Sequence, residues 1–575
     1  MRAWRWPARL LIPTALVAGL VVDSTIDRSV TLDEADAVAT EVAVSDQDAL
    51  SSTWMCPTVN MQRSGGAGIN AAGVIHITNT GDTPTRANVQ LISPTDASVS
   101  VNIDLPALST RSVDAAALLP SELVAALVES PSGGVSVARS FESEHGFDVA
   151  NCSTVAADQW FVPAGDTLRD AVDTIVLFNP LPSAAIVDFA FATEAESGAF
   201  TVVDLEGVVV AARSVQLVDV GAHVRVRESV ATSINVRSGR IVVDHLQTFD
   251  GTDGREGFSA ALATAALSTR WTSAAGYVDA DATMSVHIFN PTDEVAEVDV
   301  AALSGVAGSG DPVALSIGPR DSAVVPVSVF LDDRPLVPTL EVVGGLEFGI
   351  VVESANGVPI AVATEIGIRP VGSSLPPPAT TTTTTTTTTA PATTAPPTTG
   401  PPAAEDSENG ATSTSVAPTD TTNVPTTVPP TTVPPTTVPP TTVPPTTVPP
   451  TTVAPVTTVA EAPAPVRAER AAAGLSMRPA DPAPASRWLM VSSPGPDTHD
   501  RVVLLNHGTE SIHVVIRDLQ GQVVTELDIE SAELQVVEMS RGDAWFIDSN
   551  GPVAVSGDQH VVGGLGVGLV SGVLG

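Results

Sequence analysis

Short apolar runs, rich in valine and often alternating with polar residues, recur along residues 52–368 and again after residue 485. They include VIHIT, VSVNIDL, TIVLF, GRIVVDHL, MSVHIF and HVVIRDL, and turn-forming clusters such as TGDTP, DGTDG and GVAGSGDP lie between them. A period of two, interrupted by Gly, Pro and Asp, is typical of antiparallel strands in a β-sandwich. The pattern therefore predicts an all-β protein. One segment, SELVAALVES from Ser121 to Ser130, has a helical period and a cap-like serine, and predicts a short helix.

One phrase is repeated. Residues 271–291 read WTSAAGYVDADATMSVHIFNP, and residues 160–180 begin with Trp and end with Asn-Pro in the same way. Looser copies begin at residues 54 and 488. The first three copies start 106 and 111 residues apart, which is the length of a small independent domain and not of a solenoid repeat. We therefore predict four Ig-like antiparallel β-sandwich repeats, at residues 52–156, 157–268, 269–373 and 485–575.

The tryptophan that begins each copy and the asparagine that ends its first strand can be interpreted in two ways. The tryptophans could be stacking platforms for sugars, but one aromatic at the same place in every repeat favours a core residue. The asparagines are interpreted as turn residues whose side chains cap backbone groups. The predicted core residues are Trp54, Trp160, Trp271 and Trp488, and the predicted turn residues are Asn79, Asn179, Asn290 and Asn506.

The N-terminus has the pattern of an export signal. Three arginines precede an apolar run from Leu10 to Val22, which is 13 residues long and shorter than the roughly 20 residues of a typical membrane-spanning helix. Residues 1–22 are either a cleaved signal peptide or an uncleaved signal-anchor forming one hydrophobic helix, and the lack of a strong cleavage site favours the anchor. Residues 23–51 are acidic, lack periodicity and are predicted to be flexible.

Residues 374–484 are predicted to be a disordered linker. The segment contains ten consecutive threonines from Thr380 to Thr389 and five copies of TTVPP between Thr426 and Pro450. Proline fixes φ and removes hydrogen-bond donors, so such a sequence favours extended polyproline II and cannot form a core. Tracts of this kind outside the cell are often O-glycosylated stalks. The sequence thus predicts that repeat 4 is held away from the first three repeats.

Charge and residue usage exclude several functions. The 575 residues contain 65 acids and 26 bases, for a net charge of −39, and every base is an arginine. Such a surface repels nucleic acid, so no nucleic-acid partner is expected. The absence of lysine excludes Schiff-base chemistry and a phosphate-loop lysine. There is no HExxH, GxSxG or nucleotide-binding loop, and neither a catalytic residue nor a cofactor is predicted.

Cys56 and Cys152 are the two cysteines of the chain, and they bracket the first repeat. In an exported protein, this arrangement predicts a disulfide, which would stabilise the repeat by roughly 4–5 kcal/mol in the chain-entropy model. A reactive thiol or a metal ligand is the alternative, and it lacks the paired CxxC spacing of metal sites.

Two acidic turns, FESEHGFD and FDGTDGREG, occupy corresponding places in repeats 1 and 2. Oxygen ligands on a Gly-containing turn suit calcium, although neither turn matches an EF-hand loop. Acidic turns are also common on so negative a chain. The calcium candidates are Glu142, Glu144, Asp148, Asp250, Asp253 and Glu256.

Two other recurring positions have structural explanations. His76 and His287 share a position that holds valine in the other repeats, which favours strand packing over ligand binding. Arg111, Arg213 and Arg320 follow the repeat asparagines by about 30 residues, and could be either a basic ligand site or strand-edge arginines paired within their own repeats.

The sequence resembles an actinobacterial family of exported or membrane-anchored cell-envelope proteins of unknown function. The resemblance rests on Trp54-Met55-Cys56-Pro57 and on the Asn-Pro strand ends at 179–180 and 290–291, and it covers residues 54–368. It implies no activity, because the family has none assigned. The Thr/Pro tract and repeat 4 depart from the family pattern.

These features together predict a non-enzymatic structural or protein-interaction protein of the cell envelope. We expect its N-terminal segment to meet the cytoplasmic membrane, its bulk to lie outside the cell, and its C-terminal unit to meet a cell-wall or protein partner. If the segment is cleaved, the protein is secreted. The alternatives are a binder of wall polysaccharide, for which aromatic residues are scarce, and a hydrolase with an unfamiliar site around Glu142, Glu144 and His145.

Overall fold

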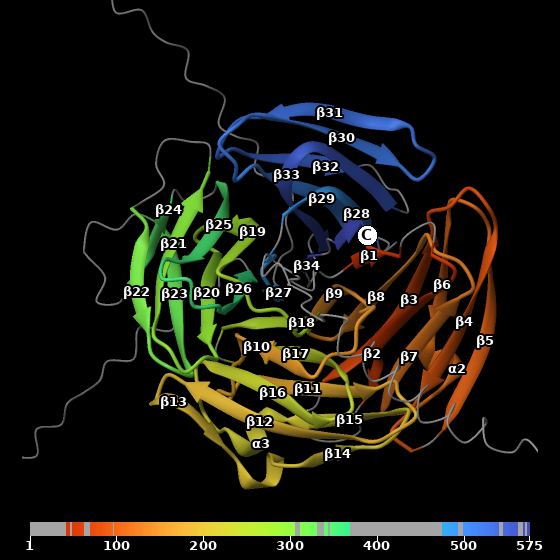
Figure 1. Cartoon of the computed structure of the whole chain (residues 1–575), viewed down its shortest axis with the longest axis horizontal. Coiled ribbons are helices and arrows are strands. Elements are labelled where there is room, and N and C mark those ends of the chain that lie inside the picture. The colour runs from red at the N-terminus through yellow and green to blue at the C-terminus, as the bar shows by residue number, and fades with distance from the viewer. Residues whose placement is uncertain are drawn as a thin grey trace, which may run out of the picture. The chain divides into compact units, whose positions relative to one another are not determined.

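Antiparallel β-sheets make up nearly all of the regular structure, which confirms the all-β prediction (Figure 1). The computed structural model describes residues 42–45, 49–62, 69–95, 97–252, 254–304, 311–329, 338–342, 346–368, 474–482, 484–492, 498–539, 544–561, 567–569 and 572–574. The chain divides into two units, residues 1–378 with 467–575 and residues 379–466. All described residues belong to the first unit, and the following description concerns that unit alone.

The four predicted repeats are described below as modules 1 to 4. Module 1 is a single sheet of eight strands, folded over so that two layers enclose a core. Strand β2 pairs at its end with β3 and so joins the layers. The elements are β2 (Ser52–Gln62), β3 (Asn70–Asn79), β4 (Thr85–Ile92), β5 (Ser98–Leu105), β6 (Ser109–Asp114), α2 (Ala115–Leu118), β7 (Leu123–Ser130), β8 (Val135–Ser143) and β9 (Gly146–Asn151).

Module 2 has two separate sheets, one of five strands and one of four. Its elements are β10 (Gln159–Val162), β11 (Ala171–Asn179), β12 (Ala185–Thr193), β13 (Glu196–Thr201), η1 (Val203–Leu205), β14 (Val208–Val210), β15 (Ser214–Asp219), α3 (Val220–His223), β16 (Val230–Ser238), β17 (Val242–Asp250) and β18 (Glu256–Leu262).

Module 3 repeats this arrangement with sheets of four and five strands. Its elements are β19 (Arg270–Tyr277), β20 (Ala282–Asn290), β21 (Ala296–Leu303), β22 (Val313–Ile317), β23 (Asp321–Val329), β24 (Leu340–Val342), β25 (Glu347–Ser354), β26 (Ala361–Ile368) and β27 (Gly474–Pro479).

Module 4 is a nine-stranded sheet in which the long strand β33 contributes to both layers. Its elements are β28 (Ala485–Val491), β29 (Thr498–Leu505), β30 (Ile512–Asp518), β31 (Val523–Ile529), β32 (Leu534–Met539), β33 (Ala544–Val561), β34 (Val567–Leu569), β35 (Gly572–Leu574) and β1 (Val42–Val44). Strand β1 pairs in parallel with β35, so part of the acidic segment 23–51, predicted to be flexible, is a strand.

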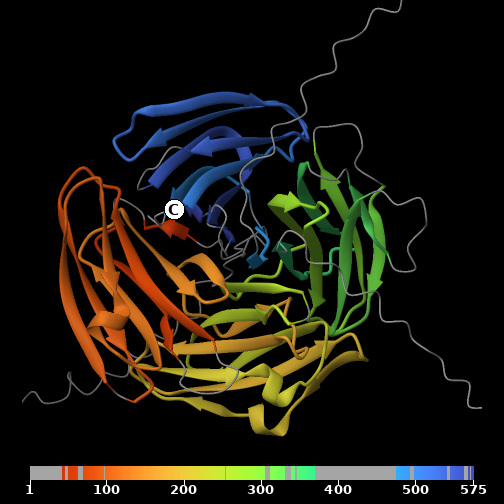
Figure 2. The ribbon, with the colours of Figure 1, turned by 180° about the vertical axis from the view of Figure 1, so that it is seen from behind.

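Each module has two layers. One contains the strand that bears the repeat tryptophan, and the other, here named the Asn layer, contains the strand that bears the repeat asparagine. The last strand of each Asn layer, here named the closing strand, is β9, β18, β27 or β34. Strand β18 packs against β9 and β27, and β34 packs against the same two strands, so the closing strands lie together in the middle of the unit (Figures 1 and 2).

In module 3 the closing strand comes from the far side of the Thr/Pro tract. Strand β27 pairs antiparallel with β26 in a register that places Gly474 opposite Ile368. In modules 1 and 2 the same hairpin is closed by a short turn, around His145 and around Gly251–Arg255. The tract is thus inserted in a hairpin of module 3. The prediction that residues 374–484 form the linker is wrong for Gly474–Pro479, because these residues complete a sheet.

The predicted helix at Ser121–Ser130 is also wrong, because Leu123–Ser130 forms strand β7. This strand lies between β2 and β4, and seven of its eight residues are buried. A strand with both faces covered has a continuous apolar run, which periodicity alone does not distinguish from a helix.

The disulfide prediction is confirmed: Cys56 on β2 is bonded to Cys152, which follows β9. The bond joins the first and last parts of module 1, and Cys56 belongs to its buried core. The described part of the chain contains no helix with the length and apolar character needed to span a membrane. Residues 1–22, where the sequence predicts a hydrophobic helix, lie outside that part.

Shortening the Thr/Pro tract is expected to stabilise the protein. Residues 369–473 connect two paired strands, and deletion of residues 376–465 leaves 15 of these 105 residues. Because loop-closure entropy grows as 1.5RT ln n, the deletion should raise the free energy of unfolding by about 1.7 kcal/mol. Denaturant unfolding of the two proteins measures the difference. If the deletion variant loses the fold, or is less stable by more than about 1 kcal/mol, the hairpin topology is wrong.

Candidate functional site at the junction of the four modules

The repeat tryptophans are all buried, and three of them make the same hydrogen bond. The indole N–H groups of Trp160, Trp271 and Trp488 donate to the carbonyl oxygens of Ile241, Ile360 and Val553, at 3.0, 2.8 and 3.0 Å. These acceptors occupy one repeat position: each directly precedes the residues that pair with the Asn strand, which begin at Val242 in β17, at Ala361 in β26 and at Ala554 in β33. Each indole therefore joins the two layers of its module.

Module 1 departs from this rule. The corresponding carbonyl, that of Val135, accepts from the backbone N–H and hydroxyl of Ser45 at 3.1 and 3.2 Å. The Nε1–H of Trp54 is buried without a partner among the described residues. The segment before module 1 therefore occupies the place that the indole takes in the other modules, which ties β1 and module 4 to module 1.

The side chains of the four repeat asparagines share one pattern of hydrogen bonds to the backbone, here named the Asn hub. Each Nδ2 donates to three backbone carbonyls: one four residues later, and two consecutive ones in the next hairpin. Each Oδ1 accepts from the backbone N–H two residues later. The structure thus places Asn79, Asn179, Asn290 and Asn506 as buried links between two turns of the same module.

Buried charges lie mainly between modules. Arg139 on β8 forms an ion pair with Asp244 on β17, and both side chains are fully inaccessible to solvent. Arg139 also donates to the carbonyl oxygen of Thr58 at 2.5 Å. Arg501 on β29 pairs with Glu347 on β25 at 2.6 Å, which links module 4 to module 3. A buried arginine requires such a partner, because the desolvation of an unpaired charge is too costly.

Strand β27 carries the ion pair that joins three modules. Arg478 pairs with Asp148 on β9 of module 1, and donates to the carbonyl oxygen of Ala260 on β18 of module 2 at 2.9 Å. The backbone N–H of Ala260 donates to the second oxygen of Asp148 at 2.6 Å. A β-carbon on Gly257 would lie 2.4 Å from Cβ of Leu475, so β18 can approach β27 closely only with glycine there.

A second polar cluster lies where modules 2 and 3 meet. Arg255 pairs with Asp166 and Asp170 at 2.6 and 2.8 Å. Burial raises the pKa of Asp166 to about 6, although the Arg255 charge opposes that shift. Nearby, Glu365 pairs with His287 at 3.1 Å; burial raises the pKa of Glu365, but the contact with His287 and the charge of Arg255 together lower it below its usual value. These carboxylates are all engaged in ion pairs.

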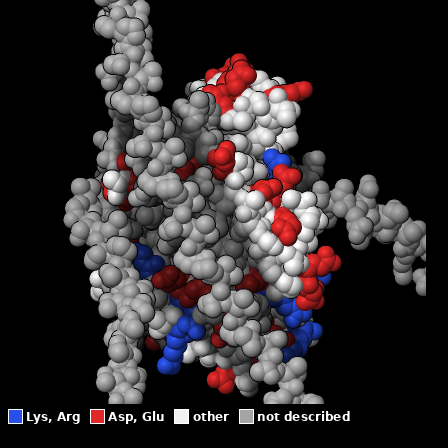
Figure 3. Space-filling model, turned by 90° about the vertical axis from the view of Figure 1, so that its left-hand side faces the viewer, with Lys and Arg blue, Asp and Glu red and all other residues white. Residues whose placement is uncertain are grey.

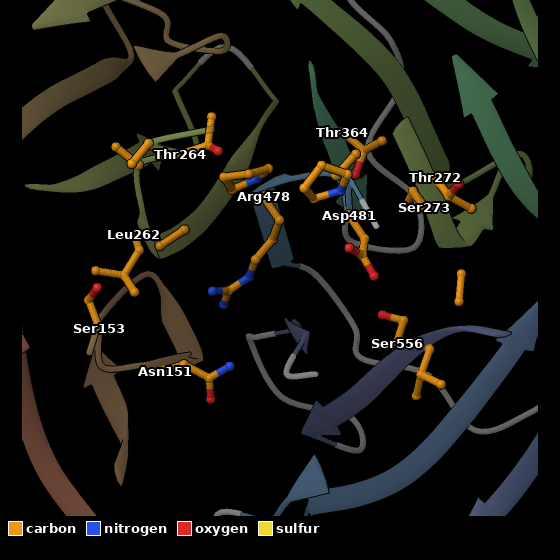
Figure 4. A pocket seen from close by; sticks show the side chains of 18 of the residues that line it. Asn151, Ser153, Leu262, Thr264, Thr272, Ser273, Thr364, Arg478, Asp481 and Ser556 are labelled. Carbon is orange, nitrogen blue, oxygen red and sulfur yellow. The ribbon is translucent and has the colours of Figure 1, made fainter. Parts of the chain in front are cut away.

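A cavity of about 170 Å³ lies beside the closing strands (Figure 4). All four modules contribute to it: Asn151 and Ser153 from module 1, Leu262 and Thr264 from module 2, and Ser556 from module 4. Module 3 contributes the largest polar set, Thr272, Ser273, Thr364, Arg478 and Asp481. Figure 4 shows the side chains of Arg478 and Asp481 reaching into the same space. This cavity is the candidate binding site.

The calcium candidates do not come together. Glu142, Glu144 and Asp250 are exposed, Glu256 is half-buried, and Asp253 lies outside the described residues. The prediction is wrong for Asp148, whose oxygens are already occupied by Arg478 and by the backbone N–H groups of Val149 and Ala260. The described residues contain no group of three His, Cys, Asp or Glu side chains able to hold a metal ion.

The recurring histidines and arginines have local roles. His76 is buried between the hydroxyls of Ser112 and Ser140, and burial lowers its pKa to about 4. Arg213 and Arg320 have positive φ angles of 49° and 54°, at the turn position that Leu108 occupies in module 1. The prediction that Arg111 is equivalent to Arg213 and Arg320 is therefore wrong: the equivalent residue is Leu108, three residues earlier. All three equivalent residues have a left-handed backbone conformation in a turn.

Sequence reasoning missed the cavity, because residues 478–482 were assigned to the linker. The available signal was the segment GLSMRPAD, whose apolar residues interrupt a region of Pro, Ala and Thr.

On the face in Figure 3, arginines gather in the lower part of the view next to acidic side chains, and the described surface there shows no continuous basic patch.

Comparison with known proteins gives one match. A family model described as "Family of unknown function (DUF5719)" matches residues 135–326. None of the curated proteins and none of the solved structures compared gives a significant match. The matched range begins at β8 and ends in β23, so it contains module 2 and the strands of modules 1 and 3 on either side. It includes Arg139, Asp244 and Thr272 but not Arg478 or Asp481.

Proposed function

We propose that the protein is a non-enzymatic structural or protein-interaction protein of the cell envelope. The observation that carries this proposal is the use of the buried charges. Arg139, Arg478, Arg255 and Arg501 each pair with a carboxylate, and three of these pairs bridge modules. These arginine and carboxylate side chains, which could serve as catalytic groups in an enzyme, are thus paired with one another and hold modules together. Such use favours a rigid scaffold.

The disulfide and the N-terminal pattern support an extracytoplasmic location. A disulfide persists in oxidising surroundings, and the basic and apolar residues 1–22 have the pattern of an export segment. We propose a membrane anchor with the bulk of the chain outside, or secretion if that segment is cleaved. Because the strands on either side of the Thr/Pro tract, β26 and β27, pair within module 3, we propose that the tract is not a spacer for repeat 4.

The partner surface is proposed to lie where the modules differ. Module 2 inserts η1, where Val203 is 82% exposed, and module 4 exposes Val523 on β31 by 51%. Photo-crosslinking residues at these two positions of the full chain, on intact cells, are expected to capture one discrete partner protein. A crosslinker in place of Arg86, an exposed residue of module 1, is the matched control. Equal capture at all three positions, or capture of none, contradicts the proposal.

Two other functions, polysaccharide binding and hydrolysis, predict different experimental results from the proposed one. Binding of wall polysaccharide would require exposed aromatic rings, whereas Trp54, Trp160, Trp271, Trp488 and Trp545 are all buried. Sedimentation of the full chain with purified wall, undiminished by protease treatment of the wall, would favour that function. Turnover of a wall polymer that is lost in a Glu142→Gln, Glu144→Gln variant would show a hydrolase.

A further inference from the structure

The chain passes once between two parts of the molecule that pack against each other. The described residues within 42–368, here named the N-terminal block, hold modules 1 and 2 and most of module 3. Those within 474–574, here named the C-terminal block, hold β27 and strands β28 to β35 of module 4. The two cysteines of the chain are bonded to each other inside the N-terminal block. Residues 369–473 are therefore the one covalent connection between the blocks.

Module 3 is incomplete without the C-terminal block. In modules 1 and 2, strands β8 and β17 are followed after a short turn by their closing strands, β9 and β18. The corresponding strand of module 3, β26, is covered by β27, which pairs with it from Ala363 opposite Pro479 to Ile368 opposite Gly474. A strand without such a neighbour exposes unpaired backbone N–H and C=O groups, and these can pair with a strand from another chain.

The two blocks make defined contacts across the boundary between them. Arg478 in the C-terminal block pairs with Asp148 of module 1. Arg501 pairs with Glu347 of module 3. Strand β27 packs against β18 of module 2, and β35 pairs with β1. Because all these contacts are noncovalent, the C-terminal block of a second copy of the chain can supply them equally well.

The length of the connection is sufficient for either arrangement. In the closed chain, it spans only the distance between Ile368 and Gly474, which is about 5 Å between the Cα atoms of an antiparallel pair. A Pro-rich chain of 105 residues can extend to roughly 330 Å. The same connection can therefore carry the C-terminal block to a second copy, while that copy's block takes its place.

We propose that two copies of the chain exchange their C-terminal blocks and so form a dimer. In this dimer, β27 of each copy completes module 3 of the other, and the contacts between the blocks become contacts between copies. Exchange of an identical element keeps every contact of the closed monomer, which makes it a low-cost route to a dimer. The proposal does not depend on the partner surface proposed above at η1 and β31.

Chain entropy sets the concentration at which the dimer forms. The r.m.s. end-to-end distance of a flexible chain of 105 residues is about 56 Å, which gives an effective concentration on the order of 3 mM. Since monomer and dimer contain the same interfaces, the dimer should have a Kd on the order of 5 mM. Dilute solution therefore favours the monomer. Copies anchored to one membrane and within reach of one another would exchange more readily, and this last step rests on the proposed anchor.

A mixture of two charge-reversed full chains tests the exchange. Glu347→Arg and Arg501→Glu each place like charges together in a closed monomer. A dimer of one copy of each pairs opposite charges in one half and keeps the native pair in the other. The mixture, refolded together, should therefore dimerise at least about 100-fold more tightly than the native chain. Size-exclusion chromatography with light scattering at about 100 µM should show a species of twice 58.6 kDa.

Three controls accompany the mixture. Each variant alone should stay monomeric, because exchange between identical copies keeps the like charges together. The single chain with both changes restores the pair in the closed form and should also be monomeric. Deletion of residues 376–465 from both partners should weaken the mixed dimer at least about 20-fold, because the shorter loop favours closure. If the doubly changed chain folds and the mixture gives no dimer, or the native chain dimerises as tightly as the mixture, the proposal is overturned.

A disulfide between copies decides the case in which the charge-reversed chains do not fold. Ile366 on β26 stands opposite Ser476 on β27. Residues so placed have β-carbons about 4.5–5.5 Å apart, close to the spacing in a disulfide. Ile366→Cys in one copy and Ser476→Cys in the other, refolded together, should give a covalent dimer on a non-reducing gel. Asn102→Cys, at an exposed position, replaces Ile366→Cys in the control. A covalent dimer no more abundant than in the control rejects the exchange.

Discussion

Replacement of Asn290 by aspartate is expected to unfold module 3 or to destabilise it by at least about 4 kcal/mol. The Asn290 amide donates to the carbonyl oxygens of Glu294, Ile317 and Gly318 at 2.6, 3.2 and 2.9 Å. A carboxylate of the same shape has no hydrogen to donate, so one buried carbonyl, that of Ile317, and two partly buried carbonyls lose their partner. Each unsatisfied buried group costs about 1–3 kcal/mol, and the buried negative charge then faces three oxygen atoms.

Denaturant unfolding followed by tryptophan fluorescence measures the effect, since Trp271 lies in the core of this module. Asn102→Asp provides the control, because Asn102 is exposed and forms its side-chain hydrogen bond at the surface. The control should change the free energy of unfolding by less than about 0.5 kcal/mol. A small loss at Asn290, comparable with the control, would mean that the hub is not a source of stability.

The repeat could be predicted because its signals are local. A tryptophan, an alternating run and an asparagine lie within 18 to 25 residues of one another in each copy, and each residue type has a reason for its place. The disulfide could also be predicted, since two cysteines allow one pairing. Two of the three acceptors of each repeat asparagine, however, are backbone carbonyls 23–32 residues away, and no side chain in the sequence identifies them.

The candidate site could not be predicted because its partners are remote and its strand is short. Arg478 and Asp148 are 330 residues apart. Strand β27 has six residues and lies between segments rich in alanine and proline, so its pattern is too brief to indicate a strand. Its pairing with β26 depends on a hairpin that contains 105 intervening residues, and local propensity carries no information about such a contact.

The fully buried pair between Arg139 and Asp244 gives the sharpest test of how the modules depend on one another. Asp244→Asn and Arg139→Met, made singly, should each lower the free energy of unfolding by about 3–5 kcal/mol, because each leaves a buried charge without its counterion. The double variant Arg139→Met, Asp244→Asn combines the same two changes, buries no charge and should recover most of that loss. The coupling energy from the cycle then measures what the pair contributes across the junction.

The exposed pair of Arg86 and Asp104 supplies the matched cycle, since its side chains are 76% and 84% accessible. Its coupling energy should be below about 1 kcal/mol, as for other surface ion pairs. Single variants at Arg139 and Asp244 that lose no more than this control would show that the junction contributes little. If the predicted losses are found, modules 1 and 2 should also unfold in one transition, because neither can expose its half of the pair alone. The junction would then be what makes the modules one structural unit.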